Sequence, residues 1–80
     1  MSVYIDNAFI TVKGIGCFHM TADDEAELDA MASALGLDPV WKEWGSTGRP
    51  YFLVNRALRM DALDLGAIEV SRHRMAELSR

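Results

Sequence analysis

The stretch His19-Met20-Thr21-Ala22-Asp23-Asp24-Glu25-Ala26-Glu27-Leu28 decides the fold expected for this chain of 80 residues. Its first residues are extended in character, and its last ones begin a helix whose first turn is crowded with carboxylates. Thr21 is expected to cap this helix, with Asp24 in a position that approximates a capping box. Gly36 is expected to end it. The helix pattern is an apolar face with the spacing i, i+3, i+4 and i+7, formed by Leu28, Met31, Ala32 and Leu35.

Upstream of this junction, residues 3–5 and 9–12 are rich in β-branched and aromatic side chains. Because only a few residues around Asp6-Asn7 separate the two segments, they predict either a hairpin or one interrupted strand. Gly14-Ile15-Gly16 is interpreted as a bend, since it lacks the third glycine of a dinucleotide-binding loop. Residues 17–20 then form a short extended segment.

Downstream, residues 38–48 contain two tryptophans between turn residues and predict a loop with a short helical turn. Residues 51–54 form a continuous apolar run that suits a buried strand. Asn55 is expected to cap a helix over residues 56–65 that stops at Gly66. Residues 67–70 give a further strand. The apolar stripe of the helix is Leu58, Ala62 and Leu65.

A final helix is expected after Ser71, which caps it, with Met75 and Leu78 on its apolar side. The alternation of strands and helices predicts an α/β fold in a single domain over residues 1–80. We expect a small mixed sheet of about four strands packed with three helices, in the order ββ(β)αβαβα.

Composition and charge narrow the class of protein. The formal net charge is −4, and the first forty residues carry seven carboxylates and one lysine, whereas the last forty carry seven basic and five acidic residues. A net acidic chain argues against nucleic acid as a direct ligand. The short chain buries only a small core, and its halves have opposite charge bias, so we expect homodimerisation.

The cellular location is predicted from the sequence features that the chain does not contain. No apolar run approaches the ~18 residues of a membrane span, so no membrane association is expected. The first residues resemble no secretory signal, and the single Cys17 suits a reducing compartment. The sequence therefore predicts a cytoplasmic protein.

Segments spread over nearly the whole chain carry a resemblance to a known family. They are Val3-Tyr4-Ile5-Asp6, His19-Met20-Thr21-Ala22-Asp23, Glu27-Leu28-Asp29-Ala30-Met31-Ala32, Leu35-Gly36, Trp41, Tyr51, Arg56 and Gly66-Ala67-Ile68-Glu69-Val70. As an ordered set they are similar to domain of unknown function 4031, a family of small bacterial and phage proteins. The resemblance implies an α/β fold of this kind, a frequent home in phages or mobile elements within a bacterial host, and no established activity. It also implies a His-Tyr-Asp tripeptide where this chain has Pro50-Tyr51-Phe52.

Three residues are candidates for catalysis: Asp6, His19 and Asp23. If strand ends bring them together, a histidine and carboxylates could bind a divalent metal or act as acid and base. Without the His and Asp expected beside Tyr51, such a site has too few ligands, so we expect no metal and no cofactor. We favour structural roles, in which the acids end a strand or face a helix N-terminus and His19 forms a hydrogen bond.

Ten residues are candidates for binding a partner. The carboxylates at the start of the first helix could imitate nucleic-acid phosphates. Of the two tryptophans, one is expected to plug the core and the other to stay exposed as an anchor. On the helix over residues 56–65, two arginines and two apolar residues are expected to face outward. The candidates are Asp23, Asp24, Glu25, Glu27, Trp41, Trp44, Arg56, Arg59, Met60 and Leu63.

Three functions follow from these features. The favoured one is a small, non-enzymatic phage or mobile-element protein that binds and inhibits a bacterial nucleic-acid-handling complex, as anti-CRISPR proteins do. The second is a remnant of a metal-dependent hydrolase or nuclease that uses Asp6, His19 and Asp23. The third is a nucleic-acid or nucleotide binder that uses the arginines of the C-terminal half.

Overall fold

The computed structural model describes residues 2–78 of the chain. These residues contain three α-helices, one 3-10 turn and six strands. In chain order they are β1 (Val3–Asp6), β2 (Ile10–Val12), β3 (Ile15–Ala22), α1 (Glu25–Ala34), the 3-10 turn η1 (Pro39–Trp41), β4 (Glu43–Trp44), β5 (Pro50–Val54), α2 (Arg56–Asp64), β6 (Ile68–Val70) and α3 (Arg72–Leu78). The predicted α/β class with a mixed sheet and three helices is confirmed. Within residues 2–78, no helix has the length and apolar character needed to cross a membrane.

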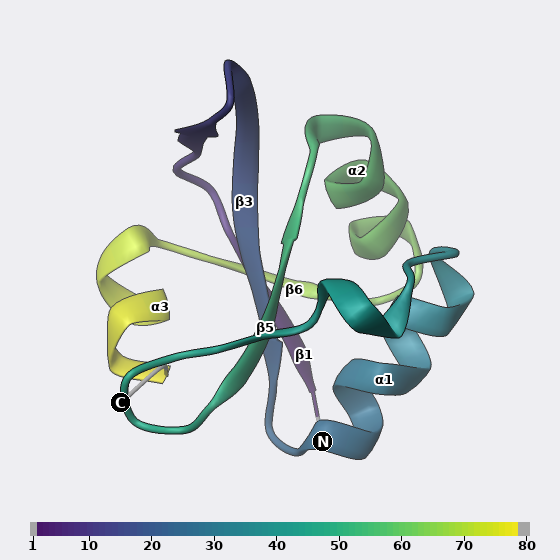
Figure 1. Cartoon of the computed structure of the whole chain (residues 1–80). Coiled ribbons are helices and arrows are strands. Elements are labelled where there is room, and N and C mark those ends of the chain that lie inside the picture. Colours follow the sequence, from purple (N-terminus) through teal and green to yellow (C-terminus); the bar gives the residue numbers. More distant parts are fainter. Residues whose placement is uncertain (1, 79–80) are drawn as a thin grey trace.

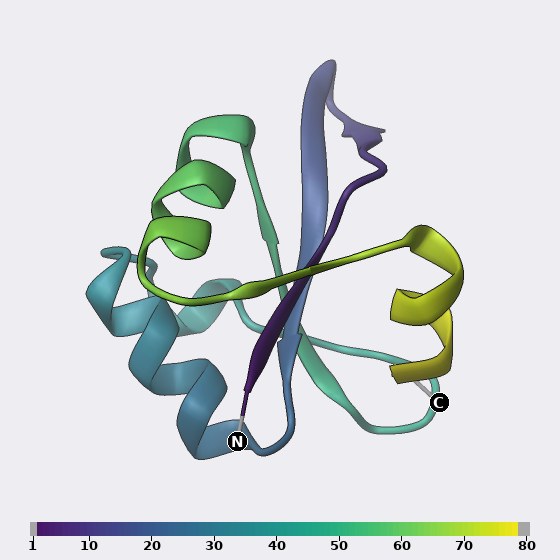
Figure 2. The ribbon, with the colours of Figure 1, turned by 180° about the vertical axis from the view of Figure 1, so that it is seen from behind.

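The sheet has the strand order β4-β5-β3-β1-β6, and β2 pairs with β3 beside this path. β3 is antiparallel to β1, β2 and β5, whereas β6 is parallel to β1. The helices α1 and α2 lie on one face of the sheet and α3 lies on the other (Figure 1). Seen from behind, β6 leads from α2 to α3 and so connects the two helical layers (Figure 2). The sheet exceeds the expected four strands because the interrupted N-terminal strand counts as β1 and β2, and because the two-residue β4 forms within the expected loop.

The core lies between the sheet and the helices α1 and α2. Successive side chains of a strand point to opposite faces, so every second residue of the central strands is buried there. The largest of these side chains are Ile5 of β1, Met20 of β3 and Phe52 of β5, and Leu28 of α1 packs with them. Burying each such side chain contributes roughly 1.5–3 kcal/mol. The residues in between, including His19, face α3.

The N-terminal segments form the interrupted strand that was one of the two predicted arrangements. β1 and β2 both run antiparallel to β3 rather than pairing with each other. Between the pairs Ile5–Met20 and Ile10–Cys17, four residues of the interrupted strand oppose two of β3. This bulge interrupts the ladder between the N-terminal strand and β3. On the opposite edge the Asn7 N–H donates to the Val70 carbonyl of β6 (3.0 Å).

Two local predictions at the start of β3 and of α1 are wrong. The bend lies at Lys13-Gly14, where both φ angles are positive, and β3 already begins at Ile15. Thr21 is not the helix cap, because β3 continues to Ala22 and buries Thr21, whose hydroxyl donates to the Pro50 carbonyl (3.0 Å). Asp24 is the cap, and its Oδ1 accepts from the Glu27 N–H (2.8 Å).

The caps of the later helices are confirmed, and so are Leu58 and Ala62 of the predicted stripe of α2, but its third residue, Leu65, is wrong. The Asn55 Oδ1 accepts from the Leu58 N–H (2.9 Å), and the Ser71 Oγ accepts from the Arg74 N–H (3.0 Å). α2 ends at Asp64, so Leu65 is the C-cap residue and is exposed rather than buried. Leu63 packs against the core instead, as Leu58 does.

Candidate functional site

The structure brings together two of the three predicted catalytic residues. Asp6, the last residue of β1, is buried, and the His19 backbone N–H donates to its Oδ1 (3.1 Å). The Asp6 Oδ2 lies 3.3 Å from the His19 Nδ1, within reach of a ring N–H at that position. The partly exposed His19 ring tilts against the Tyr51 ring, with 5.4 Å between their centroids. The cluster is therefore one buried carboxylate that orients one imidazole.

Asp23, the third candidate, lies apart from this pair. Its Oδ2 accepts from the Ser2 N–H (2.9 Å), and its own N–H donates to the Ser2 carbonyl (3.0 Å). The whole of β1 separates Ser2 from Asp6, a span of roughly 13 Å for four residue steps. Among residues 2–78, no group of three or more His, Cys, Asp or Glu side chains is placed to hold a metal ion.

The bulge after β1 explains why Asp6 is buried. In a regular ladder the Asp6 carbonyl would accept from β3, but here the Asp6 carboxylate accepts that N–H from His19. The freed carbonyl accepts from the Arg59 Nε of α2 (3.0 Å). Buried backbone groups need such partners, so the side chains of Asp6 and Arg59 complete the hydrogen bonding of the interrupted strand.

Arg59 is thus an internal residue rather than part of an outward face. Its side chain is only 14% exposed, its Nη2 lies 2.6 Å from the Glu69 Oε1, and its guanidinium lies over the Phe18 ring at 5.0 Å. Leu63 also points inward, whereas Arg56 and Met60 are exposed. Of the four residues expected to face outward, only Arg56 and Met60 do so. Arg59 turns inward because the carbonyl freed at the bulge needs a donor from α2.

Both tryptophans are exposed, so the prediction that one of them plugs the core is wrong. Trp41 is 59% exposed, Trp44 is 57% exposed, and Val40 within η1 is 78% exposed. The buried Leu37 joins the core from this part of the chain, so no tryptophan is needed there. We call Val40, Trp41 and Trp44 the tryptophan surface.

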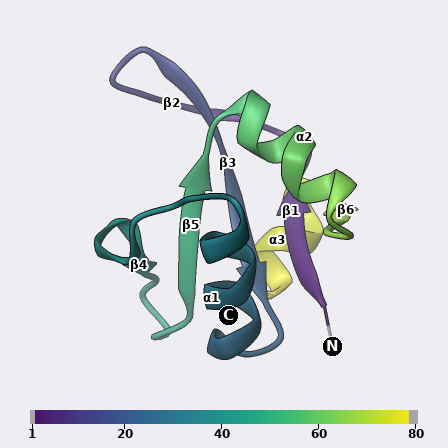
Figure 3. The same cartoon turned by 90° about the vertical axis from the view of Figure 1, so that its right-hand side faces the viewer.

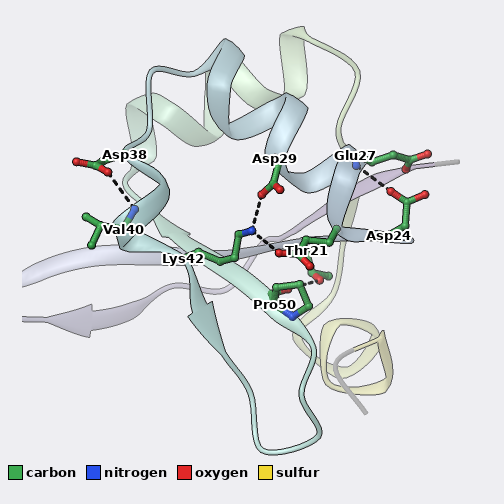
Figure 4. A network of polar contacts seen from close by, with 9 residues as sticks. Thr21, Asp24, Glu27, Asp29, Asp38, Val40, Lys42 and Pro50 are labelled. Carbon is green, nitrogen blue, oxygen red and sulfur yellow. Dashed lines mark hydrogen bonds and ion pairs between the residues drawn. The ribbon is translucent and has the colours of Figure 1, made fainter.

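Lys42 holds this segment against α1. Its Nζ lies 2.5 Å from the Glu25 Oε2 and 2.7 Å from the Asp29 Oδ1, as Figure 4 shows for the contact with Asp29. The hydrogen bond to Asp29 and then the one to Glu25 raise the pKa of Lys42 above its ordinary value of 10.5. The same Nζ lies 5.8 Å from the centre of the Trp44 ring.

Lys42 was not among the predicted site residues. A lysine between two tryptophans in a mostly acidic chain was the available signal, but the sequence does not show which of the many carboxylates it meets. The ion pairs place the tryptophan surface beside the acidic start of α1. The carboxylates of Asp23 and Asp24 already accept backbone N–H groups, while remaining exposed.

These features define a small α/β protein with helices on both faces of a mixed sheet, a buried Asp–His pair and an exposed tryptophan surface. The chain belongs to the family described as Protein of unknown function (DUF4031), whose model matches residues 3–80. This confirms the family resemblance found in the sequence. Neither the curated proteins nor the solved structures contain a match to the chain.

Proposed function

We propose that this protein works by binding a protein partner through the tryptophan surface. The observation that supports this most strongly is that Val40, Trp41 and Trp44 are all more than half exposed within one short segment. Tryptophan is the residue type most enriched among those that dominate binding energy at protein interfaces. Large apolar side chains gathered on the surface of a small protein are typical of interaction sites.

The segment that carries these side chains is held in place before any partner arrives. The Asp38 Oδ1 accepts from the Val40 N–H (2.9 Å), and the Lys42 N–H donates to the Pro39 carbonyl (3.1 Å). The two ion pairs of Lys42 fix the segment to α1. A surface that is ordered in the free protein loses less conformational entropy on binding, so its apolar contacts contribute more to affinity.

The charge beside the tryptophan surface defines the chemistry of the partner. Asp23, Asp24 and Glu25 are exposed at the start of α1, so a complementary partner would carry basic residues around an apolar pocket. In its finer form the proposal is that the partner is a bacterial nucleic-acid-handling complex, of the CRISPR-Cas type, in the host cytoplasm. The carboxylates would then stand where the complex binds phosphates, and occupancy would inhibit it.

The test compares two variants of the whole chain. Trp41→Ala/Trp44→Ala removes the anchors, and Met60→Ala removes an equally exposed apolar side chain on α2. Each protein is used to capture partners from a bacterial host, and the captured partner is purified and titrated by calorimetry. We expect the double variant to bind at least about tenfold more weakly and the Met60 variant to bind unchanged. Equal affinity of all three proteins would refute the proposal.

The inhibitory form has its own test. A purified CRISPR effector complex is mixed with an equimolar amount of this protein, and cleavage of target DNA is followed. Loss of cleavage with the wild-type chain, restored with the double tryptophan variant, supports inhibition. Unchanged cleavage by representative effector types would remove the inhibitory form and leave the binding proposal standing.

A further inference from the structure

The first residues of β3 have an open edge on the side of β5. The Asp23 N–H donates to the Ser2 carbonyl on the side of β1, and backbone groups alternate between the two edges of a strand. Odd-numbered residues of β3 therefore direct N–H and C=O to β1 and β2, and even-numbered residues direct theirs to β5. Pairing with β5 begins at Phe18, opposite Val54. The N–H and C=O of Gly16 thus point to an edge that no strand within residues 2–78 occupies.

The turn of the β2–β3 hairpin gives the same assignment independently. Lys13 and Gly14 have φ angles of 53° and 80°, as in a type I′ turn. The residues that flank such a turn, here Val12 and Ile15, form its closing hydrogen-bonded pair. Gly16, one residue further along, therefore points its backbone groups away from β2. Figure 3 shows this hairpin projecting beyond the end of β5.

A groove of about 450 Å³ lies along this open edge. Phe9, Ile15 and Phe18 supply an apolar wall, and Arg56 and Ala57 at the start of α2 line the groove as well. Gly16 lets the Phe9 ring lie close to the strand, because a Cβ there would meet that ring at 3.2 Å. The groove is therefore shaped by a strand edge and a helix start, with backbone hydrogen-bonding groups directed into it.

The charge beside the groove is positive, although the chain as a whole is acidic. Lys13 in the turn and Arg56 form no ion pair or side-chain hydrogen bond with any residue of the described range 2–78. Lys42, Arg59 and Arg74, by contrast, are each paired with a carboxylate. A ligand of this groove that carried carboxylates would therefore find unpaired cations there.

We propose that this groove binds an extended, acidic segment of a partner protein, which adds a strand to the open edge of β3 at Gly16. The backbone of the segment pairs with the free N–H and C=O, its apolar side chains contact Phe9 and Ile15, and a carboxylate pairs with Arg56. Strand addition of this kind draws affinity from main-chain hydrogen bonds and specificity from alternate side chains. It is a second binding site, separate from the tryptophan surface.

The test uses a synthetic peptide of about six residues in which valine and glutamate alternate, a length typical of a strand. The peptide is titrated into the ¹⁵N-labelled whole chain and followed by NMR. We expect shifts at Gly16 and Arg56, and protection of the Gly16 amide from hydrogen exchange. Two further peptides carry N-methyl groups on alternate amides, one on the odd and the other on the even positions. The peptide whose methylated amides face β3 should bind about tenfold more weakly, since it loses backbone donors.

Two charge-reversal variants sharpen the test. Arg56 and Arg72 are both exposed first residues of helices and both lack an ion pair within residues 2–78, so Arg72→Glu is a matched control for Arg56→Glu. We expect Arg56→Glu to weaken binding about tenfold and Arg72→Glu to leave it unchanged. No shifts at about 1 mM peptide, equal effects of the two variants, or shifts confined to α1 and β4 would each overturn the proposal. These outcomes do not depend on the tryptophan surface.

Discussion

At the scale of single residues, Asp6 shows how one side chain can look catalytic and still have a structural explanation. A buried carboxylate beside a histidine is the arrangement used to orient a general base. Here the same carboxylate also accepts the His19 N–H that the bulge leaves without a ladder partner. The backbone role therefore accounts for the burial of Asp6 without any reaction.

This account predicts different losses for two substitutions of Asp6. Asp6→Ala leaves the His19 N–H without an acceptor and should lower the free energy of unfolding by about 2 kcal/mol. Asp6→Asn keeps one oxygen acceptor and should cost about half as much. Urea denaturation of both variants measures the difference. Equal losses would mean that the carboxylate charge toward the imidazole, rather than the backbone bond, sets the stability.

The two tryptophans give the opposite case at the same scale, since they are large and yet not needed for the fold. Trp41 and Trp44 lie outside the core, so the double change to alanine should alter the free energy of unfolding by no more than about 0.5 kcal/mol. Phe52→Ala, in the core, should cost about 3–5 kcal/mol. Both are measured by chemical denaturation. A large loss in the tryptophan variant would show that these side chains stabilise the domain and would weaken their assignment as binding residues.

At the scale of elements, sequence patterns predicted most of what is determined locally, although the cap of α1 and the bend before β3 were placed wrongly. Caps and periodic faces depend on neighbours three or four residues away, and the pattern of α1 and the caps Asn55 and Ser71 were found correctly. The side-chain contacts that were missed depend on distant residues. Lys42 meets Glu25 of α1, and Arg59 meets the carbonyl of Asp6 across 53 positions of sequence. No spacing rule in a single sequence reports such contacts.

The same reason explains the errors in the candidate site. Helical spacing placed Arg59 on an outward face, but the unpaired carbonyl at the bulge needed a donor and drew it inward. Asp23 is close to His19 in sequence, yet β3 carries the two away from each other along the sheet. The two side chains lie apart because β3 extends to Ala22. The length of β3 is set by its pairing with β1 rather than by residues 17–22 themselves.

The ion pairs between Lys42 and α1 lead to a prediction about the pH dependence of stability. The pKa of Lys42 is raised by Asp29 and Glu25, so its ion pairs stabilise the folded chain fully below the pKa of an unfolded lysine, about 10.4. That contribution is lost as the pH rises through the higher folded-state pKa. Between about pH 9 and about pH 11.5 the urea midpoint of the wild-type chain should therefore fall more steeply than that of Lys42→Met. Parallel curves for the two proteins would contradict the raised pKa.

At the scale of the whole molecule, the opposite charge bias of the two halves becomes a separation in space. The acidic start of α1 lies on one face of the sheet, and α3, which begins with Arg72-His73-Arg74, lies on the other (Figures 1 and 2). Two copies can therefore bring an acidic face of one against a basic face of the other. Such an attraction between exposed charges is strong at low ionic strength and is screened within about 3 Å at 1 M salt.

The homodimer expected from the sequence can be tested through this dependence on salt. Because the attraction is electrostatic and the core is small, we propose that the chain associates at low salt and dissociates as salt is raised. Sedimentation equilibrium should give a mass near twice 8.9 kDa at about 10 mM salt and a mass near 8.9 kDa at about 1 M salt. A dimer held by apolar contacts would instead persist or tighten at high salt, and that result would place the interface on the exposed apolar side chains. A mass of 8.9 kDa under all conditions would show that the charge separation serves only to attract other partners.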